Sequence, residues 1–300
     1  MACVVLLSAT AVFAQADTWK KYCDAGKAAY HQGRYSESEN CYKAALNELK
    51  KQHIASDRLS LNLNGLGRAY TEQAKFAEAE TTFNQALNAN EKAFGSDGLE
   101  VATTLNNLAT LYAMQKKFPE AESLAVRAVK IMKKSYGPDN PNVALALANL
   151  ACMYAQDKKL VDAEPLFKQS LTIFEKNGNQ EPERVAGIYN NLTQMYAAEG
   201  KYAEAEAAGK HAIGLFEQTV GTDDPHLATS LNNLAMVYKM QGKYTEAEPL
   251  FKRSLAIVEK RLGPNHPNVL EGRKSYAALL RETNRPTEAD KESPPSSRQH

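Results

Sequence analysis

Four asparagines stand 42 residues apart along this chain: Asn107, Asn149, Asn191 and Asn233. An asparagine side chain both donates and accepts hydrogen bonds, so a row of four can pair with the backbone amides of an extended ligand. The same side chains can instead tie their own helix to the next one, because buried amides usually satisfy neighbouring polar groups. The sequence leaves both interpretations open, a binding row and a packing row.

Residues typical of catalysis do not converge in the sequence. Histidines such as His211, His226 and His266 are scattered, and none lies at a metal-ligand interval from a cluster of histidines or acids. There is no phosphate-binding loop, nucleophile elbow or dinucleotide fingerprint. Paired acids such as Glu246 and Glu248, and lysine pairs such as 116–117, fit helix ends, where the helix dipole favours them. We therefore expect no enzyme activity, no cofactor and no metal.

The elements that must position the asparagines follow the same interval. Alanine marks it six times, mostly between acidic residues, and a tyrosine follows each asparagine of the row by five residues. The alanines are Ala79, Ala121, Ala163, Ala205, Ala247 and Ala289. Self-similarity at a fixed period predicts a stacked array of repeats rather than one closed core. Such an array offers an extended concave surface.

One period, residues 139–179, shows the repeating unit. Pro141 suits a helix start, where its missing N–H costs nothing. Apolar residues then recur at helical spacing from Leu147 to Tyr154 and again from Ala163 to Phe174, which predicts two amphipathic helices. No segment alternates with the period of a strand, so we predict an all-α chain of six helix pairs. The pairs begin near Trp19, Leu59, Val101, Val143, Val185 and Leu227.

The two ends of the chain differ from the array. Residues 1–16 are apolar and end in Ala14-Gln15-Ala16, which predicts a signal peptide cleaved before Asp17; an apolar capping helix is the alternative. Residues 17–284 are predicted to form the array, with Val269 to Asn284 as a C-terminal capping helix whose polar face meets solvent. Residues 285–300 contain few apolar side chains, so we predict a disordered tail.

Composition excludes some classes of partner. The chain has 36 basic and 35 acidic residues and a net charge of +1, so nothing in its overall charge attracts nucleic acid or an anionic membrane. No stretch approaches the roughly 18 apolar residues of a membrane span, so we expect no membrane insertion of the mature chain. Cys23 and Cys41 fall on the two helices of the first repeat. They could form a disulfide in an oxidising compartment or act as small packing residues.

The spacing inside each unit is similar to that of tetratricopeptide repeats, as in Leu63, Leu66, Gly67 and Tyr70 followed by Ala79 and Phe83. The period of 42 residues and the segments at 229–235, 244–250 and 263–269 resemble the repeats of kinesin light chains, over about Leu59 to Leu280. This resemblance implies a right-handed superhelical solenoid that binds extended peptide segments of partner proteins. Kinesin light chains carry a coiled coil ahead of their repeats, whereas residues 17–58 here form a repeat. Bacterial proteins also use this long repeat, often behind a signal sequence, and we predict a protein of that exported kind.

In this family the first helix of each pair lines the concave face, so the stripe opposite its core side should face the ligand. We call ten residues on that side the candidate stripe: Arg68, Asn107, Thr110, Asn149, Gln156, Asn191, Gln194, Asn233, Met236 and Met240. The basic residue of a carboxylate clamp is missing one turn before each asparagine, so a pocket for a C-terminal carboxylate is not expected. Methionines offer adaptable apolar contact, with plain packing as the alternative.

The sequence thus predicts a non-enzymatic scaffold for protein or peptide partners, without nucleic acid. We expect it in the periplasm or outside the cell. The alternative is a cytoplasmic protein that acts as a kinesin light chain-like adaptor between cargo and motor.

Overall fold

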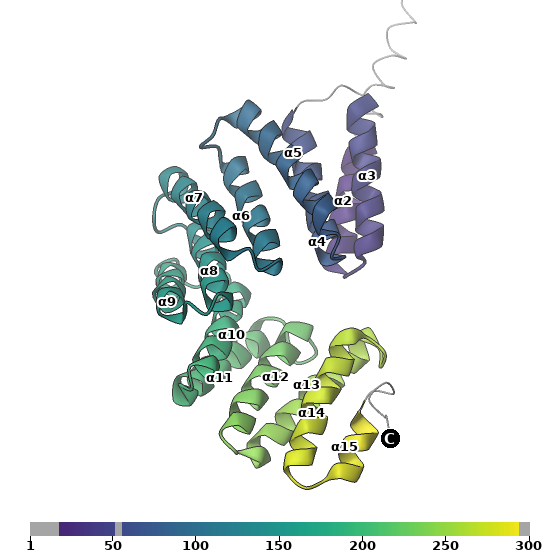
Figure 1. Cartoon of the computed structure of the whole chain (residues 1–300), viewed down its shortest axis with the longest axis vertical. Coiled ribbons are helices and arrows are strands. Elements are labelled where there is room, and N and C mark those ends of the chain that lie inside the picture. Colours follow the sequence, from purple (N-terminus) through teal and green to yellow (C-terminus); the bar gives the residue numbers. More distant parts are fainter. Residues whose placement is uncertain (1–17, 52–55, 294–300) are drawn as a thin grey trace, which may run out of the picture. The chain divides into compact units, whose positions relative to one another are not determined.

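The computed structural model describes residues 18–51 and 56–293, and within these ranges every regular element is an α-helix (Figure 1). First and second helices alternate along the chain, as the period predicts. The first helices are α2 (Thr18–His31), α4 (Ser56–Glu72), α6 (Leu99–Met114), α8 (Pro141–Gln156), α10 (Pro182–Ala198), α12 (Pro225–Met240) and α14 (Pro267–Glu282). The second helices are α3 (Tyr35–Lys51), α5 (Phe76–Phe94), α7 (Phe118–Tyr136), α9 (Leu160–Lys176), α11 (Tyr202–Thr219), α13 (Tyr244–Leu262) and α15 (Pro286–Glu292).

Local sequence explains where the helices begin and end. Proline occupies the first turn of α8, α10, α12 and α14, where no N–H is needed. The side chains of Asn140 and Asp224 cap α8 and α12 by accepting from the backbone N–H two residues later. Gly95, Gly137 and Gly263 end second helices with φ between 75° and 85°, a backbone conformation that glycine adopts without steric cost.

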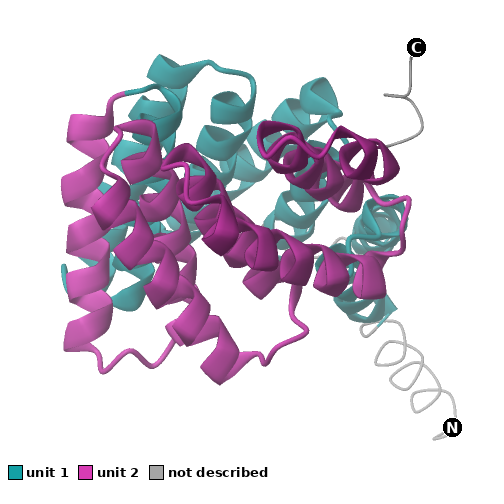
Figure 2. Cartoon of the chain, turned by 90° about the horizontal axis from the view of Figure 1, so that it is seen from below, with its two compact units in different colours: residues 1–158 teal, residues 159–300 magenta. Residues whose placement is uncertain are grey.

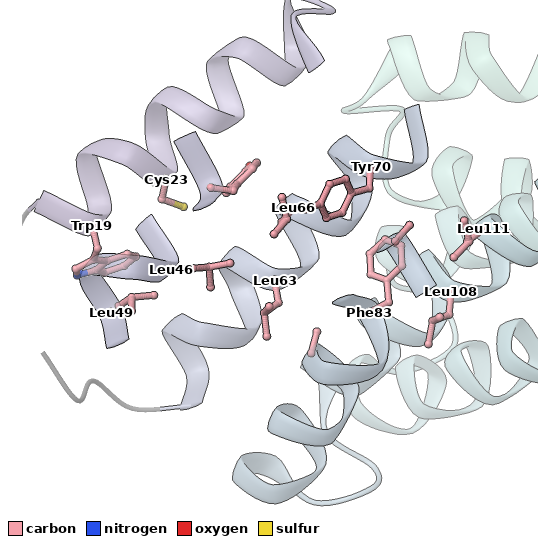
Figure 3. Packing of buried hydrophobic residues seen from close by; sticks show 13 residues of the cluster. Trp19, Cys23, Leu46, Leu49, Leu63, Leu66, Tyr70, Phe83, Leu108 and Leu111 are labelled. Carbon is pink, nitrogen blue, oxygen red and sulfur yellow. The ribbon is translucent and has the colours of Figure 1, made fainter. Parts of the chain in front are cut away.

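The helices form two compact units, residues 1–158 and 159–300 (Figure 2). In the first unit each helix from α2 to α8 packs on the next, and neighbouring first helices also touch. One buried cluster in this unit includes Trp19, Leu46, Leu63, Phe83 and Leu108 (Figure 3). In the second unit α10 contacts α9, α11 and α12, and packing continues through α15.

The alanine positions confirm the repeat register. All six alanines of the 42-residue row have an exposed fraction of 0%. At this position a larger side chain would force the packed helices apart, because protein interiors have almost no spare volume. The interval in the sequence is therefore the interval at which helices pack closely.

Residues 285–293 correct the predicted tail. Helix α15 packs on α14, Ala289 is fully buried, and Arg285 bonds Glu248 at 2.8 Å. The prediction was wrong because it counted apolar residues, whereas a seven-residue helix on an existing surface needs one small buried contact and a few polar ones. Ala289 keeps the alanine interval and was the signal for this second helix of a seventh pair, so α14 is not a terminal cap. The predicted signal peptide and residues 294–300 lie outside the described residues.

Candidate binding surface

The candidate stripe lies on one side of the first helices in each unit, away from the core. In the first unit Arg68, Thr110 and Gln156 are exposed, and Asn107 and Asn149 are half-buried. In the second unit Gln194 and Met240 are exposed, whereas Asn191, Asn233 and Met236 are half-buried. The core positions of the same helices, such as Leu147 and Leu231, are at most 1% exposed. The helical period alone explains this division, because the two stripes lie on opposite sides of each helix.

Two asparagines of the row bond to asparagines on the preceding first helix. The Nδ2 of Asn107 donates to Oδ1 of Asn64 at 3.1 Å, and Nδ2 of Asn149 donates to Oδ1 of Asn106 at 3.2 Å. We call this set of amide bonds the asparagine ladder. It gives these two side chains a packing role, because each bond joins one repeat to the next. Sequence reasoning missed the accepting asparagines, although the pair Asn106-Asn107 stands in the sequence.

The row begins only at α6 because α4 has no room for it. Gly65 occupies the equivalent position, and a Cβ atom there would lie 2.3 Å from Cζ of Tyr42. Any side chain at this point would collide with the tyrosine ring. The first repeat boundary is therefore filled by an aromatic ring where later ones carry amides.

The ladder is incomplete in the second unit. Nδ2 of Asn233 and Oδ1 of Asn190 are both buried without a hydrogen-bond partner, and these two residues have the same separation as the pairs bonded in the first unit. Oδ1 of Asn232 is likewise buried without a partner. Buried polar groups are usually satisfied, so each exception needs an explanation.

A shallow depression of about 230 Å³ brings part of the candidate stripe together in the first unit. It lies among α6, α7 and α8, and Asn107 and Asn149 line it beside the apolar side chains of Leu99, Leu145 and Met132. Amides beside an apolar surface can bind a peptide, because the amides pair with the peptide backbone and the apolar surface contacts its side chains.

Arg68 has an internal partner. Its guanidinium lies 4.2 Å from the ring centroid of Tyr30, whose hydroxyl donates to Glu72 at 2.9 Å. The burial of Tyr30 raises the pKa of its hydroxyl, against the opposing charge of Arg68. The cation is thus held against an aromatic face and joins α4 to α2.

The most regular polar feature was not found from the sequence. In five successive repeats a tyrosine on a first helix donates to a glutamate on the second helix of the preceding repeat. The bonds are Tyr112 to Glu80, Tyr154 to Glu122 and Tyr196 to Glu164 at 3.0 Å, Tyr238 to Glu206 at 3.2 Å, and Tyr276 to Glu248 at 3.1 Å. We call each such contact a repeat joint. The constant separation of 32 residues between glutamate and tyrosine in the first four joints was the available signal.

Basic side chains complete most joints. Lys201 and Lys243 bond Glu164 and Glu206 at 3.4 and 3.2 Å, and each also lies over the tyrosine ring of its joint. Hydrogen bonds from Lys210, then from Lys243 and Tyr238, outweigh partial burial and lower the pKa of Glu206 to about 2. Of the residues that the sequence assigned to helix ends, Lys117 pairs with Glu80 at 4.0 Å and Glu248 accepts from Tyr276, so these two link adjacent repeats.

Other reactive groups lack a catalytic setting. Cys23 and Cys41 form no disulfide, and burial raises the pKa of the Cys152 thiol to about 11, which keeps that thiol protonated and unreactive at neutral pH. No three potential metal ligands cluster within residues 18–51 and 56–293. No helix in the same ranges is long and apolar enough to cross a membrane.

Consecutive helix pairs that bury the same positions against their neighbours define a helical-repeat protein. The chain belongs to the tetratricopeptide repeat family. The model of this family matches residues 20–92, 57–134, 100–176, 184–260 and 228–291. This fold is generally a non-enzymatic interaction scaffold, and the match indicates no catalytic family. No curated protein sequence matches the chain.

Solved structures share the fold at low identity. TPR-like repeats from Podosopora anserina, named after kinesin light chain, are 23% identical over 66% of this chain and 93% of theirs, with a TM-score of 0.56. BtubC (BKLC) from P. vanneervenii is 24% identical over 79% of this chain and 92% of its own, with a TM-score of 0.61. A Rap protein in complex with competence and sporulation factor is 18% identical over 92% of this chain and 76% of its own, with a TM-score of 0.63. These similarities confirm that the chain resembles kinesin light chain-like repeats in its fold.

Proposed function

We propose that the protein is a scaffold that binds an extended segment of a partner protein along the candidate stripe. The observation that carries this proposal is the depression among α6, α7 and α8, where Asn107 and Asn149 lie beside apolar side chains. The ladder uses one N–H of each amide, and an amide has two N–H donors and an acceptor oxygen. The same asparagines can therefore hold neighbouring repeats together and still pair with a ligand backbone.

The similarity to a Rap protein solved in complex with competence and sporulation factor supports a role in binding a partner. The stripe favours an uncharged ligand backbone, because nine of its ten residues are neutral and its single cation, Arg68, is held against Tyr30. Binding energy would come from main-chain hydrogen bonds, with selectivity added by side chains that enter depressions.

Selection of random twelve-residue peptides displayed on phage, with the full chain as bait, tests this function. Enriched peptides are then made with a fluorescent label and titrated by anisotropy. Thr110→Arg places a bulky cation on the stripe and should weaken binding at least about tenfold, because an unpaired charge acts against the ligand. Val126→Arg on α7 is the control, since Val126 is also exposed but lies on a second helix. Failure to enrich any peptide, or equal losses in the two variants, would overturn the proposal.

We further propose that the protein is exported, on the evidence of residues 1–16 in the sequence. The mature chain should then begin at Asp17. Intact-mass measurement of protein from its native host tests this. A retained Met1 or Ala2 would favour the cytoplasmic, kinesin light chain-like adaptor instead.

A further inference from the structure

A second depression, in the second unit, uses the same repeat positions as the first. It lies among α12, α13 and α14. Thr229, Asn232 and Val258 line it, and they stand three repeats beyond Thr103, Asn106 and Met132 of the first depression. The two sites are therefore versions of one place in the repeat, and a comparison of their residues shows what each can bind.

The two depressions differ at three positions of their third helix, which is α14 in the second depression and α8 in the first. Glu271, Gly272 and Ser275 of α14 occupy the places held by Leu145, Ala146 and Asn149 of α8. Each replacement shortens a side chain or exchanges an apolar group for a carboxylate. The volume is correspondingly larger, about 480 Å³ against about 230 Å³.

The exchange of asparagine for serine also interrupts the asparagine ladder. In the first depression Oδ1 of Asn106 accepts from Nδ2 of Asn149. Ser275 is too short to reach across in the same way, and Oδ1 of Asn232 is buried without a partner. The terminal torsion of asparagine is broad, so this amide can turn its oxygen toward a donor that enters the depression.

The charge that lines this depression is negative. Among the described lining residues Glu271 carries a carboxylate, and none is a lysine or an arginine. Lys274, on the same helix, bonds Glu271 at 3.4 Å, and because both side chains are more than half exposed, solvent weakens this pair. The ring of His226 stacks on Phe216 and bonds Oδ1 of Asp224, so that acid is already engaged. The carboxylate of Glu271 and the oxygen of Asn232 thus lie at a space of about 480 Å³, which is large enough for a long side chain.

We propose that the depression among α12, α13 and α14 is a specificity pocket for a cationic side chain, lysine or arginine, of the partner segment. Glu271 pairs with the charge, and the oxygen of Asn232 accepts a further hydrogen bond. Val258 and Leu262 contact the aliphatic stem, because long basic side chains bury their methylene groups against apolar surface. This inference rests on the proposed function and names one residue class in its ligand.

Methyl NMR of the full chain tests the pocket without the natural partner. Nα-acetyl-arginine methylamide and Nα-acetyl-lysine methylamide are titrated while the methyl signals of Val258 and Leu262 are followed. Citrulline and norleucine derivatives with the same blocked termini are the neutral probes. We expect the cationic probes to shift these methyl signals saturably, and at least about fivefold more tightly than their neutral counterparts.

Two variants locate the effect. Glu271→Gln should remove the preference for the cation, whereas Glu204→Gln, which neutralises an exposed acid on α11 outside the pocket, should leave it intact. Ser275→Asn restores the ladder donor and fills space, so it should weaken both cationic probes. Equal binding of neutral and cationic probes, no saturable shift, or a response unchanged by Glu271→Gln would overturn the pocket.

The peptide selection distinguishes this inference from the proposed function. If peptides bind the stripe but none carries a basic residue whose replacement matters, the pocket fails and the scaffold function stands. If the cationic probes bind but no peptide is enriched, the cation site stands and its link to a partner segment fails.

Discussion

The repeat joint in the second unit gives the sharpest test of what holds neighbouring repeats together. Tyr238 on α12 is 8% exposed, and its hydroxyl donates to Glu206 on α11 at 3.2 Å. Tyr238→Phe removes that bond and keeps the ring. A hydrogen bond to a charged group contributes about 1.5–3 kcal/mol. Glu206 keeps Lys210 at 2.7 Å and Lys243 at 3.2 Å, and it is partly exposed. We therefore expect a loss of about 1 kcal/mol.

A double-mutant cycle with Glu206→Ala isolates the bond from other effects of each change, because alanine, unlike glutamine, leaves no acceptor for the hydroxyl. The coupling free energy between the two positions should also be about 1 kcal/mol, since they are in direct contact. Urea unfolding supplies the free energies. Hydrogen exchange should speed up first in α11 and α12, because repeats depend on their neighbours.

Tyr189→Phe is the matched control for the lost hydroxyl. Tyr189 lies on α10 in the same unit, its ring stacks on His211 at 5.1 Å, and its hydroxyl makes no hydrogen bond to any described residue. This change should alter the unfolding free energy by less than about 0.5 kcal/mol. The reasoning is refuted if Tyr238→Phe costs no more than Tyr189→Phe, or if the coupling is zero.

Three further outcomes are expected. Ala163→Leu should cost roughly 1–3 kcal/mol through overpacking, and unchanged urea unfolding would show that the helix register is wrong. Asn107→Ala should lower the melting temperature without any ligand, since it breaks the bond to Asn64; an unchanged melting temperature would leave that asparagine with a binding role alone. Glu206 has a folded pKa of about 2 against an ordinary 4.5, so its stabilising effect should be present above about pH 4.5 and lost as pH falls toward 2. In urea unfolding, Glu206→Gln should reduce this loss of unfolding free energy at low pH. An identical loss in both proteins would contradict the lowered pKa of Glu206.

The candidate stripe could be placed from the sequence, whereas the bonds of its residues could not. Helical periodicity assigned Gln156 and Met240 to the side away from the core, where the structure has them exposed. Periodicity says nothing about which side chain of a neighbouring helix comes within hydrogen-bond distance. The asparagine ladder therefore emerged only from the structure, since Asn107 meets Asn64 through the offset between two packed helices.

Sequence by itself determined the repeat, the helix pairs and their register, because each repeat buries the same side chains against its neighbours and the period records that packing. Ala163 and its equivalents are buried for this reason. Tertiary structure decided which polar groups meet between repeats, as in the joint of Tyr238 and Glu206. It also decided that residues 286–292 form a helix, because the surface that stabilises α15 belongs to α14. Such contacts depend on distances between separate helices, and a recurring interval in the sequence shows that two positions repeat together without giving the distance between their side chains.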